Sequence, residues 1–204
     1  MNLYNQDCLP AMKEMPDNAY DLAIVDPPYG IGVNGMNMGS RRTIRPDKRI
    51  WDNAPPPPEY FAELRRVSSN RIIWGGNYFG LPPTRCFLIW DKGESMYGRS
   101  FAGCEQAWTS FDRSAAMFKY NPMQLNRIHP TQKPVALYKW LLTNYAKPGQ
   151  TILDTHLGSG SIAIACHDYG YDLTAYEIDK EYFEAATDRI ERHMSQGQLF
   201  QAIG

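Results

Sequence analysis

The chain has 204 residues, of which 43% are hydrophobic and 21% are charged. This composition is ordinary for a globular protein and excludes a disordered chain, a coiled coil and collagen. Because the formal net charge is −1, a nucleic acid partner would have to meet a local basic patch of the protein.

The cysteines and the apolar runs indicate the cellular setting. Cys8, Cys86, Cys104 and Cys166 form no C-x-x-C pair and no metal-ligand spacing with the four histidines. We therefore expect buried free thiols in a reducing compartment and no metal. The first residues lack the pattern of a signal peptide, and no apolar run approaches the length of a membrane span. We expect a cytoplasmic protein with no membrane partner.

Apolar runs, and the Gly and Pro residues between them, predict strands that alternate with helices. In chain order we expect a strand at 3–5, a helix at 9–15, a strand at 21–25, a helix at 59–67, strands at 71–76, 86–90 and 105–111, a helix at 134–147, a strand at 151–154, a helix at 161–170, a strand at 172–179 and a helix from 179 onward. This alternation predicts a single α/β domain over residues 1–204, with a doubly wound, mostly parallel, Rossmann-like sheet. Residues 34–58 show no periodicity, and we expect a mobile loop there.

The stretch "LAIVDPPYG" places chemistry at the end of a predicted buried strand. Asp26 and the carbonyl of Pro27 can accept the two hydrogens of an exocyclic amine, while the ring of Tyr29 stacks on a flat base. Pro27 and Pro28 in succession fix the backbone before a substrate arrives. The motif therefore favours an enzyme that acts on an aromatic amine.

A second motif, "TILDTHLGSGSIAIA", reads as a strand, a glycine turn and a helix. Gly158, Gly160 and Ala163 fit G-x-G-x-x-A, in which glycines allow a tight turn and close approach of a ligand. Glu177 ends the next strand, where a carboxylate can bind two ribose hydroxyls. The pattern predicts a nucleoside-containing cofactor but does not separate a dinucleotide from S-adenosyl-L-methionine.

With "DPPY" first and "DTHLGSGS" second, joined through "HPTQKP", nearly the whole chain resembles the beta-class DNA amino-methyltransferases. These enzymes methylate adenine N6 or cytosine N4 with S-adenosyl-L-methionine. The resemblance implies the Rossmann-like fold of S-adenosylmethionine-dependent methyltransferases, with a circularly permuted motif order. Since "DPPY" mostly accompanies adenine in this family, it implies site-specific N6 methylation of adenine after base flipping. The catalytic residues would be Asp26, Pro27, Pro28 and Tyr29.

The resemblance also assigns cofactor contacts, position by position. They fall on Asp7, Cys8, Asp26, Thr131, Lys133, Asp154, His156, Gly158, Ser159, Gly160, Ser161 and Glu177. Asn77 or Tyr78 would line the target pocket. Two positions depart from the family pattern, because His156 stands in place of a phenylalanine and Ser161 in place of a threonine. A protonated His156 would repel a sulfonium.

The implied partner is double-stranded DNA, and relatives in this family often form homodimers. The basic residues of the 34–58 loop follow the catalytic tyrosine, where they would meet phosphates; they are Arg41, Arg42, Arg45, Lys48 and Arg49. Residues 91–128 are the candidate for a short target-recognition insert. The resemblance implies a role in restriction-modification in a bacterial cell, and the short chain suggests a phage or prophage enzyme without nuclease chemistry.

Other functions fit parts of the sequence. Cytosine-N4 methylation of DNA and amino-methylation of RNA or protein use related sites, although in most of the latter enzymes the cofactor motif comes first. A catalytically idle DNA-binding module would explain His156 as a sign of decay. A nicotinamide oxidoreductase is supported by the G-x-G-x-x-A pattern alone.

Overall fold

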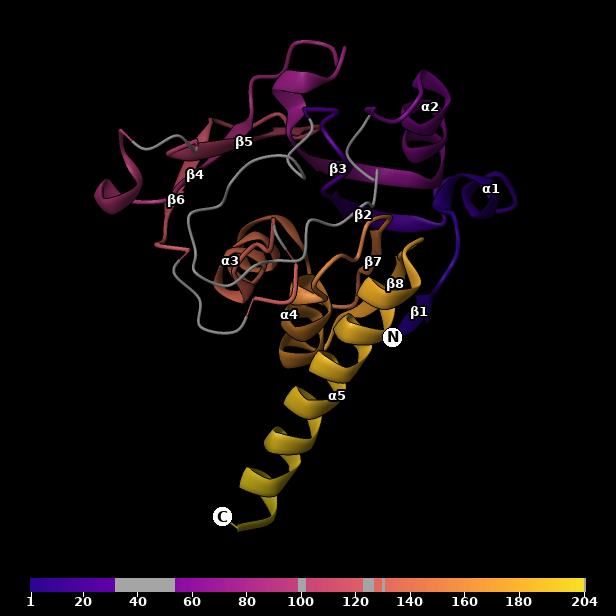
Figure 1. Cartoon of the computed structure of the whole chain (residues 1–204). Coiled ribbons are helices and arrows are strands. Elements are labelled where there is room, and N and C mark those ends of the chain that lie inside the picture. The colour runs from indigo at the N-terminus through magenta and orange to yellow at the C-terminus, as the bar shows by residue number, and fades with distance from the viewer. Residues whose placement is uncertain (32–53, 99–101, 123–126, 130, 204) are drawn as a thin grey trace.

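The computed structural model describes residues 1–31, 54–98, 102–122, 127–129 and 131–203, apart from the side chains of residues 197–203 (Figure 1). The strands are β1 (Asn2–Tyr4), β2 (Tyr20–Val25), β3 (Ser68–Trp74), β4 (Phe87–Asp91), β5 (Cys104–Thr109), β6 (Ala116–Lys119), β7 (Thr151–Asp154) and β8 (Asp172–Tyr176). The helices are α1 (Cys8–Lys13), α2 (Pro58–Val67), α3 (Val135–Tyr145), α4 (Ser161–Tyr169) and α5 (Lys180–Ile203). Each predicted element is present, with ends that differ by a few residues.

The described residues form one eight-stranded sheet in the order β1-β8-β7-β2-β3-β5-β4-β6. Among these strands β5 alone runs antiparallel to its neighbours, β3 and β4. The prediction of a doubly wound, mostly parallel sheet is therefore confirmed. Strand β6 was not predicted, because its four residues are too few to show a period of two.

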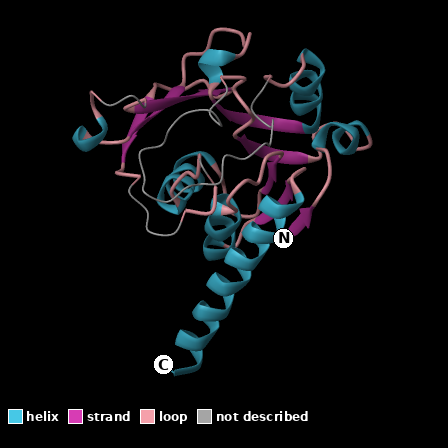
Figure 2. Ribbon diagram, in the orientation of Figure 1, coloured by secondary structure: helices cyan, strands magenta, loops and turns pink. Residues whose placement is uncertain are grey.

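Helices cover both faces of the sheet, with α1 and α2 on one face and α3, α4 and α5 on the other (Figures 1 and 2). Strand β2 lies in the middle and is buried on both sides. Leu22 and Ile24 pack in the cluster under α3 and α4, whereas Ala23 and Val25 pack in the cluster under α1 and α2. This double burial explains why "LAIV" is an uninterrupted apolar run.

The helix ends follow from local hydrogen bonding. The carboxylate of Asp179 accepts the backbone N–H groups of Glu181 and Tyr182 at 2.9 and 3.0 Å, so Asp179 is the N-cap of α5. At the C-terminal end of α1, the carbonyls of Met12 and Met15 accept hydrogen bonds from Arg66 of α2 at 2.7 and 2.6 Å. These bonds satisfy carbonyls at the C-terminus of α1 and join the two helices.

The cysteine prediction is correct for three of the four residues. Cys8, Cys86 and Cys166 are buried free thiols, but Cys104 is exposed. Residues of β5 point alternately to the two faces of the sheet, and Cys104 lies on the face opposite to the buried Ala107. Within the described part of the chain, no helix is both long enough and apolar enough to span a membrane.

Candidate active site

The two motifs meet at the carboxyl edge of the sheet. Strands β2 and β7 are parallel neighbours, with Ala23 opposite Leu153. Asp26 follows the end of β2 and Asp154 ends β7, so both carboxylates lie at the same edge. The sheet therefore brings "DPPY" and the glycine turn together beyond the carboxyl ends of two neighbouring strands.

Tyr29 is held by contacts on its hydroxyl and on its ring. Its hydroxyl donates to Asp26 Oδ1 at 2.7 Å, and its ring stacks on Tyr78 with 4.9 Å between centroids and 16° between planes. Gly75 has a φ of +71°, and a Cβ added there would lie 2.2 Å from Tyr29 Cε1. A glycine is thus needed at position 75, both for the left-handed backbone and for room beside the ring. Burial, with the negative charge of Asp26, holds the pKa of Tyr29 well above its ordinary value, so the group remains a phenol.

Lys133 contacts the carboxylate of Asp26 directly. Its Nζ lies 2.5 Å from Asp26 Oδ2 and 3.0 Å from Glu105 Oε2, and its side chain is only 2% exposed. The ammonium also lies 5.3 Å from the ring centroid of Trp74. Burial alone would lower the pKa of Lys133, but the two carboxylates outweigh it and raise the pKa. The sequence assigned Lys133 to the cofactor, whereas the structure pairs its charge with two acids.

Glu105 is the site residue that the sequence analysis missed. It lies on β5 and also pairs with Lys92, which follows β4, at 2.7 Å. Burial would raise the pKa of Glu105, yet the ammonium groups of Lys133 and Lys92 lower it to about 2. The sequence could have indicated it, because side chains two residues apart in a strand lie on the same face. Glu105 therefore lies on the face of the buried Ala107 and Thr109.

The glycine turn is tightly packed and held by side chains from other elements. Gly160 has a φ of +71°, and a Cβ there would lie 2.9 Å from Ile190 Cδ1 of α5. Arg189 donates to the Ser159 carbonyl and to Ser161 Oγ at 2.5 and 3.0 Å. The predicted turn residues are therefore placed together, with their backbone fixed.

Carboxylates surround this turn. Glu177 accepts the N–H groups of Gly158 and Asp179, each at 2.9 Å. Asp154 is buried and accepts the N–H of His156 at 3.0 Å. Burial, together with the negative charges of Asp26 and Glu177, raises the pKa of Asp154 to about 8. Asp154 is therefore mostly protonated near pH 7, and a cationic ligand bound beside it would favour its ionised form.

His156 faces α2. Its Nδ1 lies 2.9 Å from Thr155 Oγ1, and its ring meets that of Tyr60 edge-on at 5.5 Å. Burial lowers the pKa of His156 to about 4. The imidazole is therefore neutral near pH 7 and packs as an aromatic ring.

The remaining predicted cofactor residues border the same region. Thr131 Oγ1 lies 3.1 Å from His129 Nδ1, and a Cβ on Gly158 would lie 3.9 Å from the His129 ring. Asp7 caps α1 by accepting the N–H of Leu9 at 2.9 Å. Cys8 is buried at the start of that helix, and burial raises its pKa to about 12. Their contacts with a cofactor stay predictions.

Two expectations concern DNA contacts. The basic residues Arg41, Arg42, Arg45, Lys48 and Arg49 lie outside the described residues. The candidate insert at residues 91–128 contains β5 and β6, which are strands of the main sheet and not an added unit. Target recognition by the segments between these strands stays a prediction.

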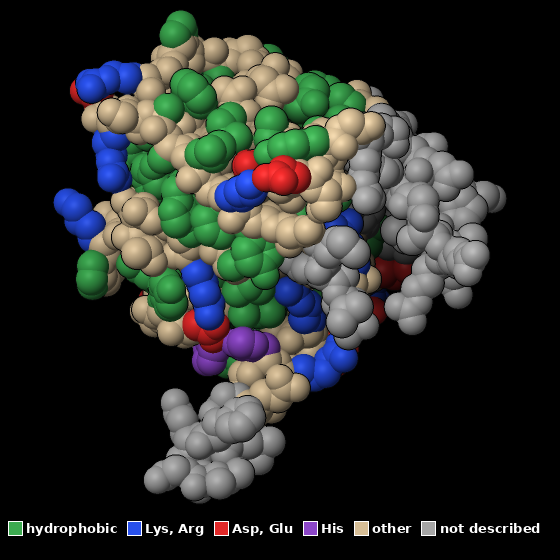
Figure 3. All heavy atoms as spheres, turned by 90° about the vertical axis from the view of Figure 1, so that its left-hand side faces the viewer, with side chains coloured by type: hydrophobic (Ala, Val, Ile, Leu, Met, Phe, Trp, Pro, Cys, Tyr) green, Lys and Arg blue, Asp and Glu red, His purple; other side chains and the backbone are tan. Residues whose placement is uncertain are grey.

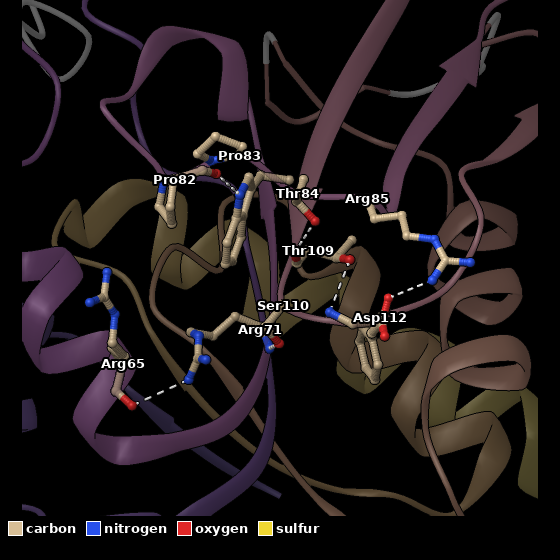
Figure 4. A pocket seen from close by; sticks show the side chains of 11 residues that line it. Arg65, Arg71, Pro82, Pro83, Thr84, Arg85, Thr109, Ser110 and Asp112 are labelled. Atoms are coloured by element: carbon tan, nitrogen blue, oxygen red, sulfur yellow. Dashed lines mark hydrogen bonds and ion pairs between the residues drawn. The ribbon is translucent and has the colours of Figure 1, made fainter.

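Two other surface features do not belong to this edge. In Figure 3 histidine side chains lie beside acidic and basic ones, and His193 Nε2 of α5 contacts Asp168 Oδ1 of α4 at 2.6 Å. Figure 4 shows an open hollow of about 380 Å³ lined by residues that include Arg65, Arg71 and Arg85. None of the residues predicted for catalysis or for the cofactor lines this hollow.

Comparison with known proteins is consistent with this geometry. The DNA methylase family model (N6_N4_Mtase) matches residues 91–188. The type II methyltransferase M.HpaI of Haemophilus parainfluenzae is 36% identical over 233 residues, which cover 91% of this chain and 72% of the relative. The fold resembles that in the crystal structure of the M1.HpyAVI–SAM complex, with a TM-score of 0.61, 19% identity and coverage of 92% and 98%. It also resembles the PvuII DNA methyltransferase (cytosine-N4-specific), with a TM-score of 0.60, 12% identity and coverage of 95% and 89%.

The buried charge of Lys133 leads to a prediction about stability. Lys133→Met leaves Asp26 and Glu105 close together without the shared cation, and we expect the free energy of unfolding to fall by about 3–5 kcal/mol. The loss should be larger at about pH 8 than at about pH 5, because protonation of one carboxyl removes the repulsion.

Urea denaturation measures this difference. Lys119→Met is the matched control, because Lys119 pairs with Glu94 at the exposed surface and water already screens that pair. Equal losses for the two variants would show that the buried ion pair has no special importance for folding.

Proposed function

The chain belongs to the DNA methylase family of N6 and N4 amino-methyltransferases, and we propose that it methylates the exocyclic N6 of adenine in double-stranded DNA. The observation that carries the proposal is the position of Asp26 and Tyr29 at the same sheet edge as the glycine turn. Direct transfer of a methyl group requires an amine acceptor and a cofactor turn side by side, and the pairing of β2 with β7 supports that arrangement.

The charge of this edge supports S-adenosyl-L-methionine as the cofactor. Asp154 and Glu177 lie at the turn, where they offer the pyrophosphate of a dinucleotide no cation, whereas a cationic ligand would favour their ionised forms. A sulfonium and an α-ammonium group are cationic and suit these carboxylates. Glu177 would bind the ribose hydroxyls, and the glycine turn would lie along the methionine part. When bound, the cofactor supplies an electrophilic methyl group.

The residues of "DPPY" would hold the target base. The half-exposed ring of Tyr78 stacks on Tyr29, so that face of Tyr29 accepts a flat ring. In the proposal the flipped base takes the place of Tyr78, and stacking recovers part of the few kcal/mol that flipping costs. Asp26 and the carbonyl of Pro27 accept the amine hydrogens and direct the nitrogen lone pair toward the methyl group.

The choice of adenine over cytosine rests on the "DPPY" sequence. The likeness to the PvuII enzyme, named as cytosine-N4-specific, concerns the fold and does not separate the two bases. The proposed DNA contacts of the basic residues at 41–49 rest on the sequence alone. A homodimer and a target-recognition role for parts of 91–128 are likewise proposals.

Methyl transfer from labelled S-adenosylmethionine to unmethylated duplex DNA, followed by nucleoside analysis, tests the reaction and the base together. We expect N6-methyladenine from the parent, and a loss of about 100-fold or more in Asp26→Ala because the amine loses its acceptor. N4-methylcytosine would select the other branch of the family. Cofactor binding without any DNA product would point to RNA or protein as the substrate.

Gly75 gives a second test of the arrangement around Tyr29. We expect Gly75→Ala to lower kcat by about 10- to 100-fold, because the new Cβ displaces the Tyr29 ring. Gly80→Ala is the control, since a Cβ at that position meets nothing within 4 Å. Comparable activity of the two variants would contradict a role for the Tyr29 ring position.

The neutral state of His156 predicts how cofactor binding responds to pH. Because burial lowers its pKa to about 4, the ring should not repel the sulfonium between about pH 8 and about pH 5.5. Calorimetric titrations of the parent and of His156→Phe should therefore change in parallel over this range. An affinity that drops near pH 6.5 in the parent alone would show that the ring is protonated there.

A further inference from the structure

Four charged side chains with alternating signs lead away from the catalytic motif. Asp26 contacts Lys133 at 2.5 Å, Lys133 contacts Glu105 at 3.0 Å, and Glu105 contacts Lys92 at 2.7 Å. Every member is at least four-fifths buried, with exposed side-chain fractions of 17%, 2%, 20% and 13% along this order. The two acids and two bases cancel in charge, so Lys133 is shared between two competing carboxylates.

The strand directions explain how these residues meet. Asp91 ends β4 and Lys92 follows it, so Lys92 lies at the carboxyl edge. Because β5 is antiparallel, its first residues reach the same edge, and Glu105 comes before the pairing of Ala107 with Trp74. The one reversed strand therefore places an acid beside Lys133 that a parallel strand would place at the opposite edge.

We propose that Glu105 is a positioning residue that competes with Asp26 for the Lys133 ammonium and thereby keeps Asp26 basic enough to accept the proton released by the methylated amine. This inference rests on the proposed function and deepens it. It assigns a role to Glu105, which contacts neither Tyr29 nor the glycine turn in the hydrogen bonds and ion pairs of the described residues.

The proton transfer balances within the proposed reaction. The N6 lone pair forms a bond to the methyl carbon while the bond from carbon to sulfur breaks, and sulfur leaves as a neutral thioether. The nitrogen then carries a positive charge and loses one of its protons to a carboxylate oxygen of Asp26. Asp26 becomes neutral and returns the proton to water after the products leave.

The surroundings of Asp26 determine whether it can take that proton. Burial raises its pKa, the ammonium of Lys133 lowers it, and the charge of Glu105 raises it again. Tyr29 donates a hydrogen bond to Asp26 and favours the ionised form. The other titratable groups that face Asp26 electrostatically are Tyr60 of α2, Tyr138 of α3 and Asp154 of β7. Among the described residues that face Asp26 electrostatically, Lys133 is the cation, so its division between two acids controls the basicity of Asp26.

A purely structural explanation accounts poorly for this arrangement. Replacing a buried ion pair with packed apolar residues is often neutral or stabilising, so stability alone does not require Glu105 and Lys133. Buried charges next to a cleft, with displaced pKa values, are a recurrent feature of functional sites. Here the chain holds a buried ammonium against its catalytic acid and adds a second acid to weaken that contact.

Two variants should move the pKa of Asp26 in opposite directions. In Glu105→Gln the ammonium of Lys133 pairs with Asp26 alone, and the negative charge of Glu105 is lost. The pKa of Asp26 should therefore fall by about one unit. Lys92→Met leaves Glu105 with Lys133 as its remaining partner and removes a distant positive charge, so the pKa should rise. Both changes are near in shape to the parent, and thermal melting checks that both variants fold.

The pH dependence of kcat/KM for DNA methylation reads this pKa in the free enzyme. The acidic limb should move to lower pH in Glu105→Gln and to higher pH in Lys92→Met, and kcat should fall in Glu105→Gln because its Asp26 is a weaker base. NMR of carboxyl-¹³C aspartate, with Asp26→Asn to assign the signal, titrates the same group without any catalysis.

Glu94→Gln and Lys119→Met are the matched controls, because this exposed pair lies at 3.4 Å on neighbouring segments and away from Asp26. Opposite shifts in the two test variants, with none in the controls, support the inference. Equal, absent or reversed shifts overturn it, even if the parent methylates DNA. A parent that methylates no DNA overturns the proposed function and the proton-accepting role, while the carboxyl titration still decides whether Glu105 sets the pKa of Asp26.

Discussion

The buried ammonium of Lys133 is the constraint on which the site depends. A side chain that is 2% exposed can keep its charge only where carboxylates replace the lost water, and here Asp26 and Glu105 do so. These three residues come from the end of β2, the start of β5 and the segment before α3. The ion pairs therefore fix the three segments relative to one another, and they place Asp26 where Tyr29 can donate to its other oxygen.

The DPPY motif and the glycine turn, which both lie at the carboxyl ends of the strands, differ in how their acidic groups are paired. Near "DPPY" the negative charge of Asp26 is paired with the positive charge of Lys133. At the glycine turn, the described partners of Asp154 and Glu177 are backbone N–H groups and include no ion pair. Under the proposed function, two carboxyl groups at the turn, beside a network of ion pairs with no net charge, would suit a cationic methyl donor and an uncharged base. The raised pKa of Asp154 reflects its burial and the nearby negative charges of Asp26 and Glu177.

The sequence predicted most of the fold because its signals are local. The apolar run of β2 and the glycine turn each depend on a constraint within a few residues. It could not predict that β5 is reversed, because a short strand has the same period of two in either direction. The partners of Lys133 were missed for the same reason, since a contact between residues 105 and 133 depends on strand order and direction. The contacts of the basic residues at 41–49 stay beyond reach, because they fall outside the described residues.

The permuted order of the two motifs has no chemical cost, because the site is assembled by the sheet and not by the chain. Strands β2 and β7 are far apart in sequence but hydrogen-bonded in the sheet, so their carboxyl ends converge whichever comes first. The permutation instead decides which segments lie between the motifs. Here that interval contains β3 to β6, and so it supplies Gly75, Lys92 and Glu105 to the surroundings of Asp26 and Tyr29. The interval between the motifs thus determines the surroundings of the residues that we propose to be catalytic.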